Sequence, residues 1–587
     1  MIIAGPGTGK TRTLAHRLAY QIAERGAAPQ SCLAITFTRR AAGEMRERLA
    51  VLAPGQAAGI TVTTFHALGL MILRDHPGPA GLTSSFGIAD DDARLEVAAG
   101  LAGSPRAGRR LLADAAADPE RRQQLVQALL ARDLVDLDGL VELPAALLRD
   151  RPVLAAALRA RWPLISVDEY QDIDAAQFEL LRLLAGDGSG LTAIGDPDQA
   201  IYGFRGADVG FFLRFAAHYP GATTLHLSRN YRATQAIVTG ALQAIGPATL
   251  VPGRELRAVR PRGAPITFHE AADEQAEAAW IAAAIDGLLG GSSFHSLDSG
   301  RADGYGLDGI DLSDVAILYR TDAQAGPLGQ ALTRAGLPFQ KSSHDLLQRR
   351  TGVPDIIREM RLSLAGPGSR GPAADSGPPD SRPAPDSRPP PDGTRAAGQA
   401  GGGTATGAGM TVSARLRGVV RRLAARGPGS AAAAVDVRSA GQVLAPLARR
   451  CGRDLERFLT EISLGAMADA LDPRAEAITL LTLHAAKGLE FDVVFLAGCE
   501  RGLLPLWVPG IAPAAAPDPA EERRLLFVGM TRARTRLFLS CAAQRTRHGA
   551  TATAGPSPFL RAISPALLDH HPVPRPRRPA DRQLRLL

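Results

Sequence analysis

Near its start the chain carries residues that could bind the phosphates of a nucleotide: Gly5, Pro6, Gly7, Thr8, Gly9, Lys10 and Thr11. They follow a short apolar run, residues 1–4, and lead into an amphipathic stretch, residues 12–23, so we expect a turn from a strand into a helix. Glycines let backbone N–H groups and the N-terminus of the helix point toward one phosphate. Lys10 would reach the β- and γ-phosphates, and the Thr11 hydroxyl would bind Mg²⁺.

The positions of Lys10 and Thr11 favour a nucleotide site over an ordinary flexible loop. The strict form of the motif has a glycine where Ala4 stands, and this small residue fits equally well. A flexible glycine-rich loop would not explain why Lys and Thr follow Gly9 at the correct offset. The loop alone predicts a nucleoside triphosphatase and no particular target.

Two apolar runs downstream end in acidic residues. Residues 164–167 are typical of a buried strand and precede Asp168 and Glu169, and residues 191–195 precede Asp196. Parallel strands bring such ends together at the carboxyl edge of a sheet. Asp168 could hold Mg²⁺ there, while Glu169 could orient and deprotonate the attacking water. A solvated acidic turn is the alternative, which the recurrence of the pattern weakens. Loop and acids together predict an α/β fold with a RecA-like ATPase core.

Further motifs surround these two in a fixed order. They are residues 36–42 (TFTRRAA), 64–66 (TFH), 168–172 (DEYQD), 195–207 (GDPDQAIYGFRGA), 229–232 (RNYR), 482–491 (TLHAAKGLEF) and 528–533 (VGMTRA). Their joint occurrence resembles the UvrD/Rep/PcrA family of superfamily 1 DNA helicases, over residues 1 to about 545. The resemblance implies two RecA-like P-loop NTPase lobes with parallel sheets, each carrying an inserted, mainly helical subdomain.

The resemblance also implies roles around bound ATP. Gln199 would report the state of the γ-phosphate to the DNA-binding segment. Tyr231 and Arg12 would enclose the adenine base, and Gly488 and Glu490 would lie at the nucleotide, with Glu490 on the ribose. Arg232 and Arg532 are candidate arginine fingers that reach across a cleft to the transferred phosphoryl group. Without the resemblance, both could equally be salt-bridged surface arginines.

Aromatic residues gather at the same motifs, although only 5% of the chain is aromatic. Single-stranded nucleic acid is held by aromatic stacking and by polar contacts to phosphate. Phe204 stands where relatives have Trp, which keeps the stack but reduces its area. For any one aromatic, and for Phe65 in particular, packing in the core is the alternative. The candidate DNA-binding residues are Phe37, Thr38, Thr64, Phe65, His66, Tyr202, Phe204 and His484.

The order of motifs and composition predicts the domains. Residues 1–68 and 161–224 would form the first lobe, and the Ala-, Leu- and Arg-rich residues 69–160 a helical insertion. Residues 225–345 and 468–545 would form the second lobe. Residues 346–467 would be a reduced second insertion, within which the Pro-, Gly-, Ser- and Asp-rich residues 366–409 are expected to be disordered. Residues 546–587 are expected to be an extended basic tail.

The chain departs from the family before the phosphate-binding loop. Relatives carry an upstream segment with a glutamine that reads the adenine edge, whereas only residues 1–4 precede the loop here. We expect that the start codon is misassigned. A truncated chain and a relaxed nucleotide selectivity are the alternatives.

Composition is consistent with a nucleic-acid partner inside the cell. The 587 residues are too many for one core and carry a formal net charge of +8, although an Arg- and Ala-rich composition alone would also raise the charge. The four scattered cysteines form no CxxC pair, and the sequence shows neither a signal peptide nor a membrane-spanning run. We therefore expect a cytoplasmic protein without a disulfide framework, and no membrane partner. Gln583–Leu587 (QLRLL) resembles the peptide by which bacterial replication proteins bind the sliding clamp.

These observations predict an ATP- and Mg²⁺-dependent translocase and helicase on single-stranded and tailed duplex DNA. By the resemblance it would move 3′ to 5′, in DNA repair, replication or recombination. One alternative is a DNA-stimulated ATPase that displaces proteins without processive unwinding, which the reduced second insertion favours. The other is an inactive scaffold that binds DNA or the clamp, which intact Lys10, Asp168, Glu169 and Arg532 argue against.

Overall fold

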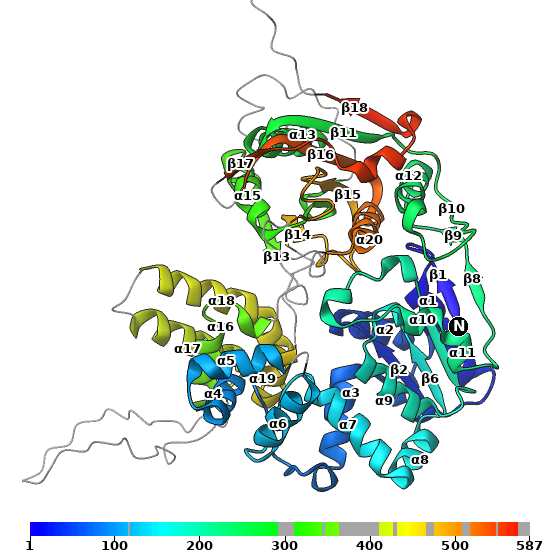
Figure 1. Ribbon diagram of the computed structural model, residues 1–587, viewed down its shortest axis with the longest axis vertical. Helices are drawn as coiled ribbons and strands as arrows, with labels where there is room; N and C mark the ends of the chain where they lie inside the picture. The colour runs from blue at the N-terminus through cyan, green and yellow to red at the C-terminus, as the bar shows by residue number, and fades with distance from the viewer. Residues whose placement is uncertain are drawn as a thin grey trace, which may run out of the picture. The chain divides into compact units, whose positions relative to one another are not determined.

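The computed structural model describes residues 1–115, 118–290, 310–342, 347–362, 410–426, 431–464, 475–507, 517–547 and 550–572 (Figure 1). These residues belong to two compact units. The first comprises Met1–Leu346 and Leu464–Leu587, and the second comprises Leu347–Ser463. The segment expected to be disordered, residues 366–409, and the clamp-like peptide Gln583–Leu587 lie outside the described residues.

The first unit begins with a six-stranded parallel sheet in the order β3-β2-β6-β7-β1-β8. All five residues of β2 are buried, as expected for a parallel strand that is covered on both faces. Helices α1 (Lys10–Ala23), α2 (Arg39–Leu52) and α9 (Ala175–Ala185) pack apolar side chains onto it. The strands are β1 (Ile2–Ala4), β2 (Cys32–Thr36), β3 (Thr61–Thr64), β6 (Leu164–Val167), β7 (Leu191–Gly195) and β8 (Leu225–Leu227).

Between β3 and β6 the chain is mainly helical, in agreement with the pattern of residues 69–160. Gly69 of α3 lies so close to α7 that an added Cβ atom would stand 1.7 Å from the carbonyl oxygen of Leu140, so only glycine fits there. A short parallel pair, β4 (Gly87–Ile88) and β5 (Leu134–Val135), completes the insertion. Its helices are α3 (Phe65–Asp75), α4 (Asp91–Ala102), α5 (Pro105–Asp114), α6 (Pro119–Leu130), α7 (Gly139–Asp150) and α8 (Pro152–Arg161).

A second sheet in the same unit has the order β13-β14-β12-β15-β16-β11-β18, with parallel neighbours throughout, and β17 (Ala550–Thr553) pairs antiparallel with β16. Helices α12 (Gln235–Ile245), α13 (Glu274–Leu288), α15 (Ala325–Arg334) and α20 (Pro519–Met530) bury apolar faces in its cores. The strands are β11 (Ile266–Asp273), β12 (Val315–Tyr319), β13 (Phe339–Ser342), β14 (Ile478–Thr482), β15 (Phe491–Leu496), β16 (Ala533–Arg547) and β18 (Leu568–His571).

Two predicted boundaries of the second lobe were wrong. Leu225–Leu227, assigned to the second lobe, is strand β8 of the first sheet, where it pairs with β1. Residues 550–572 are not part of an extended tail, because β17 and β18 belong to the second sheet and Phe559, Leu560 and Ile563 are buried in its core. The proline- and arginine-rich composition of the tail concealed this short apolar pattern.

The second unit is helical in its described part. It contains α16 (Val353–Leu362), α17 (Val412–Arg426), α18 (Ala431–Arg450) and α19 (Leu455–Leu464). Its limits, Leu347 and Ser463, lie within a few residues of the insertion expected at 346–467. Among the described residues, no helix of either unit combines the length and the apolar character needed to cross a membrane.

A buried ion cluster joins three parts of the second sheet. The Arg545 guanidinium on β16 contacts Glu500, with Nε 2.7 Å from Oε1, and also pairs with Glu277 on α13. The backbone N–H groups of Ala542 and Gly498 donate to the same two carboxylates, each at 2.8 Å. Arg545 is thus the cation that compensates both buried charges within the cluster.

We expect Arg545→Ala to destabilise the first unit by about 3–5 kcal/mol, because it leaves two buried carboxylates without a compensating charge. Arg536→Ala, on the same strand but with a partly exposed side chain outside the cluster, should change the free energy of unfolding by less than about 0.5 kcal/mol. Chemical denaturation of the two variants, followed by circular dichroism, measures both effects. Equal small losses would show that the cluster does not stabilise the sheet.

Candidate active site

The phosphate-binding loop is held in shape by residues that follow β8. Gly7 and Gly9 have φ angles of 69° and 85°, which favour glycine, and α1 starts at Lys10. A Cβ atom on Gly7 would stand 2.6 Å from Asn230 Nδ2. Asn230 Nδ2 donates to the carbonyl of Pro6 at 2.7 Å, and the Tyr231 N–H donates to that of Gly7 at 2.9 Å. The loop therefore has a fixed, left-handed turn directly before a helix N-terminus, as a phosphate site requires.

Two acidic residues lie beside the loop where the sequence predicted them. Thr11 Oγ1 donates to Asp168 Oδ2 at 2.9 Å, and Lys10 Nζ lies 3.1 Å from Glu169 Oε1. Both carboxylates follow β6, and Glu169 adopts the left-handed φ of 51°, which is uncommon outside glycine. Such strained backbone is found most often at functional sites.

The electrostatics of this pair fit a bound Mg²⁺. Burial and the neighbouring Glu169 carboxylate raise the pKa of Asp168. Burial alone would also raise the pKa of Glu169, but the Lys10 and Lys487 ammonium groups outweigh it and lower that pKa. Asp168 thus lacks a full counter-charge, and its oxygen and that of Thr11 are the hard donors that Mg²⁺ prefers. These two residues would hold the ion.

Gln199 lies at the end of a chain of contacts that crosses from the first sheet to the second. Its side-chain amide Nε2 donates to Asp196 Oδ2 at 2.7 Å, and its backbone carbonyl accepts from Lys487 Nζ at 2.6 Å. The same Lys487 ammonium pairs with the buried Asp172 carboxylate. Lys487 follows β14 of the second sheet, so it connects the two lobes directly. The sequence reasoning had missed it, although it stands inside the quoted motif 482–491.

Arg254 is a second residue that the sequence reasoning missed. Its guanidinium bridges Asp196 and Asp198 at 2.7 and 2.6 Å; both carboxylates are fully buried, and the Arg254 side chain is 9% exposed. It also packs against the phosphate-binding loop, because a Cβ atom on Gly5 would stand 2.8 Å from its Nη2 atom. No motif surrounds Arg254 in the sequence, so nothing there indicated this role.

The two candidate arginine fingers have unequal surroundings. Arg232 forms an ion pair with Glu490, and its Nε atom is buried without a partner among the described residues. Arg532 is 2% exposed and donates to neutral oxygens, at 2.9 Å to Val528 and 3.1 Å to Leu489. It has no ion pair within the described chain, and burial together with Arg232 lowers its pKa to about 9. An anion entering the site would relieve this unfavourable burial of positive charge.

One cavity of about 770 Å³ collects most of the predicted nucleotide residues. Phe37, Thr38 and Tyr202, which the sequence assigned to DNA, also line it. Thr8 is instead buried, where its hydroxyl donates to the carbonyl of Gly5 at 2.8 Å. The predicted nucleotide and catalytic residues in the lining are Pro6, Gly7, Gly9, Lys10, Thr11, Arg12, Asp168, Glu169, Gln199, Tyr231, Arg232, Gly488, Glu490 and Arg532.

Glu490, expected at the ribose, is paired in this structure with Arg232 and Arg534. Those two guanidinium groups outweigh burial and lower its pKa. Tyr231, expected at the adenine, has 59% of its surface exposed. The carboxylate is thus charged and the aromatic ring accessible at the mouth of the cavity, and both assignments stay predictions.

The candidate DNA-binding aromatics differ strongly in exposure. Phe65 is 4% exposed and packs in the core of the first lobe, the alternative that the sequence left open. Tyr202 is 3% exposed, stacks on Phe37 with ring centroids 5.2 Å apart, and donates its hydroxyl to the His484 carbonyl. Phe204, in contrast, is 63% exposed and meets the His484 ring edge to face. Phe204 therefore has exposed ring surface available for stacking, whereas Phe65 has almost none.

The polar candidates partly serve the local fold. Thr38 and Thr64 are N-caps of α2 and α3, where their hydroxyls accept from the N–H groups of Ala41 and Ala67. His66 follows in the first turn of α3, and burial lowers its pKa. These contacts leave open whether the three residues also touch DNA.

Comparison with known proteins covers almost the whole chain. The family model described as the UvrD/REP helicase N-terminal domain matches residues 1–117 and 112–220, and that of the UvrD-like helicase C-terminal domain matches residues 225–365 and 439–544. The ATP-dependent DNA helicase PcrA of Bacillus subtilis (strain 168) is 30% identical, over 97% of this chain and 84% of its own length.

Two mycobacterial proteins are similar to the same extent. The ATP-dependent DNA helicase UvrD1 of Mycobacterium tuberculosis (strain H37Rv) is 32% identical over 98% of this chain and 84% of its own length. UvrD2 of the same strain, also named an ATP-dependent DNA helicase, is 33% identical over 96% of this chain and 79% of its own length.

Proposed function

Because the chain belongs to the UvrD/REP family of helicases, we propose that it is an ATP-dependent DNA helicase that moves 3′ to 5′ along single-stranded DNA. The observation that carries the proposal is the shared cavity, in which Lys10 of the first lobe and Arg532 of the second face one nucleotide-sized space. A site built from two lobes can couple a change in the nucleotide to a change in the gap between them. DNA repair, replication and recombination are the processes in which such an activity would serve.

The residues around the cavity divide the chemistry of ATP hydrolysis among them. Lys10 neutralises charge on the β- and γ-phosphates, and Glu169, held by Lys10 and Gln171, orients water and accepts its proton. Thr11 and Asp168 hold Mg²⁺, which when bound offsets the negative charge of the phosphates. Arg532 and Arg232 stabilise the charge that develops on the transferred phosphoryl group, since Arg532 is buried without an ion pair among the described residues and the Nε atom of Arg232 is buried without a partner there.

The path from nucleotide to DNA runs through Gln199, Lys487 and Tyr202. Lys487 Nζ donates to the backbone carbonyl of Gln199 and lies 4.9 Å above the Tyr202 ring. Because this oxygen belongs to the main chain, the contact changes when the Gln199 backbone, and not only its side chain, moves with the γ-phosphate. The neighbouring Phe204 and His484 rings, which touch each other across the two lobes, would shift with it. The stacking contact between these rings and the DNA strand would then strengthen and weaken in turn during the hydrolysis cycle.

Displacement of proteins from DNA without processive unwinding is the second candidate. The observation that favours it is the second unit, whose described part contains four α-helices, α16 to α19, and one short 3-10 helix, Leu347–Arg349. A strand-displacement assay run beside a protein-removal assay separates the two activities. An inactive scaffold is the third candidate, and hydrolysis by the unmodified chain would exclude it.

We expect the chain to hydrolyse ATP faster with single-stranded DNA and to unwind a duplex with a 3′ tail but not one with a 5′ tail. Lys10→Ala should reduce hydrolysis and unwinding by at least about 10³-fold, because the phosphate charge loses its fixed cation. A steady-state ATPase assay measures hydrolysis, and a fluorescence strand-separation assay measures unwinding. Unwinding from the 5′ tail alone would contradict the polarity, and DNA-independent hydrolysis would contradict the coupling.

Phe204→Ala should spare basal hydrolysis and raise the DNA concentration for half-maximal stimulation by about tenfold, since one base-stacking contact is worth about 1–3 kcal/mol. Tyr20→Ala removes another exposed aromatic side chain, on α1, and serves as the matched control with unchanged stimulation. Titration of each variant with oligo(dT) gives its basal rate of hydrolysis and its DNA concentration for half-maximal stimulation. Equal losses of basal and stimulated rates in Phe204→Ala would refute the role in DNA binding.

We further propose that Gln583–Leu587 binds the bacterial sliding clamp, on the resemblance of this peptide to clamp-binding peptides. Its two C-terminal leucines would enter an apolar groove of the clamp. Deletion of the five residues should abolish retention of the chain on immobilised clamp while leaving hydrolysis unchanged. Undiminished retention would refute the proposal.

A further inference from the structure

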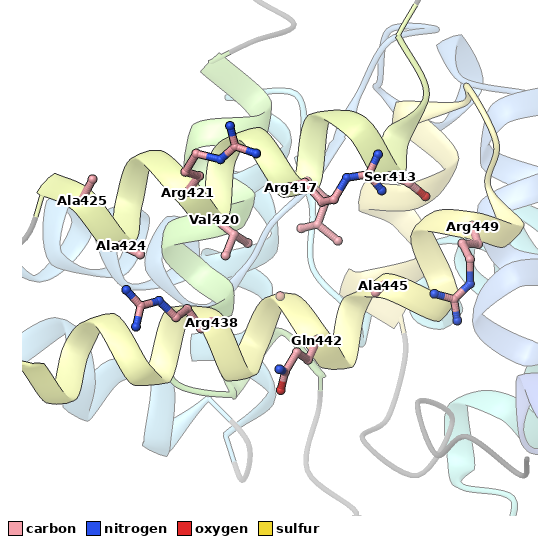
Figure 2. Close-up of a pocket in the computed structure, with 12 residues that line it drawn as sticks. Ser413, Arg417, Val420, Arg421, Ala424, Ala425, Arg438, Gln442, Ala445 and Arg449 are labelled. Carbon is pink, nitrogen blue, oxygen red and sulfur yellow. The ribbon is translucent and has the colours of Figure 1, made fainter. Parts of the chain in front are cut away.

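Two helices of the second unit enclose an apolar groove of about 770 Å³ that has no part in ATP hydrolysis (Figure 2). We call it the α17–α18 groove. Its lining residues recur at intervals of three or four on both helices, so that one stripe of each helix forms a wall. They are Ser413, Leu416, Arg417, Val420, Arg421, Ala424 and Ala425 of α17, and Arg438, Gly441, Gln442, Ala445 and Arg449 of α18.

The floor of the groove is formed by small side chains. Gly441 lets α18 approach α17 closely, because a Cβ atom there would stand 2.6 Å from Val420 Cγ2. Ala424 and Ala445 leave room above the point of closest approach. Side chains this small permit a further helix to pack into the space between two others. The lining from Ser413 to Ala425 extends over about 18 Å at 1.5 Å per residue, the length of about three helical turns.

Arginines border this apolar floor without acidic neighbours. Arg417 and Arg421 lie on α17, and Arg438 and Arg449 on α18, and all four side chains are exposed. Figure 2 shows their guanidinium groups spread along the two helices. The lining contains no carboxylate, and none of the four forms an ion pair within the described part of the unit. The groove thus presents apolar surface between rows of unpaired positive charge.

We propose that the α17–α18 groove is a docking site for an acidic amphipathic helix of a partner protein. The partner's apolar stripe would cover Val420, Ala424 and Ala445, and Asp or Glu residues beside that stripe would pair with the arginines. Guanidinium groups bind carboxylates bidentately, which fixes the register of such a helix as well as adding affinity. The apolar floor favours this partner over nucleic acid, whose backbone would offer phosphates but no apolar stripe to fill it.

The test measures binding of a synthetic peptide to the full-length chain by fluorescence anisotropy. The probe is a fluorescein-labelled helix of 14 residues, with leucine and alanine at every third or fourth position and glutamate beside them. A peptide of the same composition in scrambled order keeps the charge but loses the stripe. In about 150 mM salt, which screens diffuse attraction, we expect the scrambled peptide to bind at least about tenfold more weakly.

Variants of the chain locate the bound peptide. Arg421→Glu with Arg438→Glu should weaken binding by at least about tenfold, whereas Arg450→Glu with Arg453→Glu, an equal charge change outside the groove, should change it by less than about threefold. Ala445→Trp fills the groove without changing the charge and should also weaken binding at least about tenfold. All variants should keep the DNA-stimulated hydrolysis of the unmodified chain, which shows that they are folded.

Four results would overturn the proposal. Equal binding of the ordered and scrambled peptides, or equal losses in the two charge-reversal variants, would mean that the peptide binds by diffuse charge alone. Displacement of the peptide by a 20-base-pair duplex whose own binding is weakened by Arg421→Glu with Arg438→Glu would make the groove a nucleic-acid surface. Dimers in sedimentation that Ala445→Trp dissociates would identify a second copy of the chain as the occupant.

Discussion

Buried negative charge at the carboxyl edge of the first sheet is the constraint on which the site depends. Asp168, Glu169, Asp172 and Asp196 are crowded there, largely removed from water, and each needs a cation or a strong donor. Three ion pairs meet this need: Lys10 with Glu169, Lys487 with Asp172, and Arg254 with Asp196. Only Lys10 comes from the phosphate-binding motif itself. Arg254 follows the first sheet and Lys487 belongs to the second, so neutralising this edge requires both lobes to be folded and in contact.

Two arginines that line the same cavity are less well compensated than these carboxylates. Arg532 bonds neutral oxygens, and Arg232 shares Glu490 with Arg534. Asp168 and Arg532 line the same cavity, and both have pKa values shifted toward their neutral forms, mainly by burial. A magnesium nucleotide carries complementary charges, the cation for Asp168 and the phosphates for the arginines. A ligand that supplies both charges is therefore bound more tightly than one that supplies only one of them.

The sequence predicted the local parts of this site well, because their chemistry is contained in a few consecutive residues. Lys10, Thr11, Asp168 and Glu169 lie where the strand-then-turn pattern placed them. Residues that act through long-range packing were missed or misassigned. Arg254 lies outside every sequence motif, although it pairs with Asp196. Strand β8 follows the last motif of the first lobe and was assigned to the second lobe, but it pairs with β1. Strand β18 lies in a segment whose proline and arginine content does not indicate a strand. Phe65 and Phe204 look alike in sequence, and only tertiary packing buries one and exposes the other.

The distribution of charge also explains why a basic chain need not use all its arginines on DNA. Around the nucleotide cavity, the arginines named above are buried or paired with carboxylates, so they are not available to bind DNA phosphates. In the α17–α18 groove the arginines are exposed and lie beside apolar surface, and removal of that apolar surface from water by a partner would be favourable. A phosphate backbone would pair with the arginines and leave the apolar floor in contact with water. An acidic amphipathic helix would pair with the arginines and also cover the apolar floor. The second unit thus offers a surface whose chemistry differs in kind from that of the ATPase, and selection of a partner could proceed there without disturbing hydrolysis.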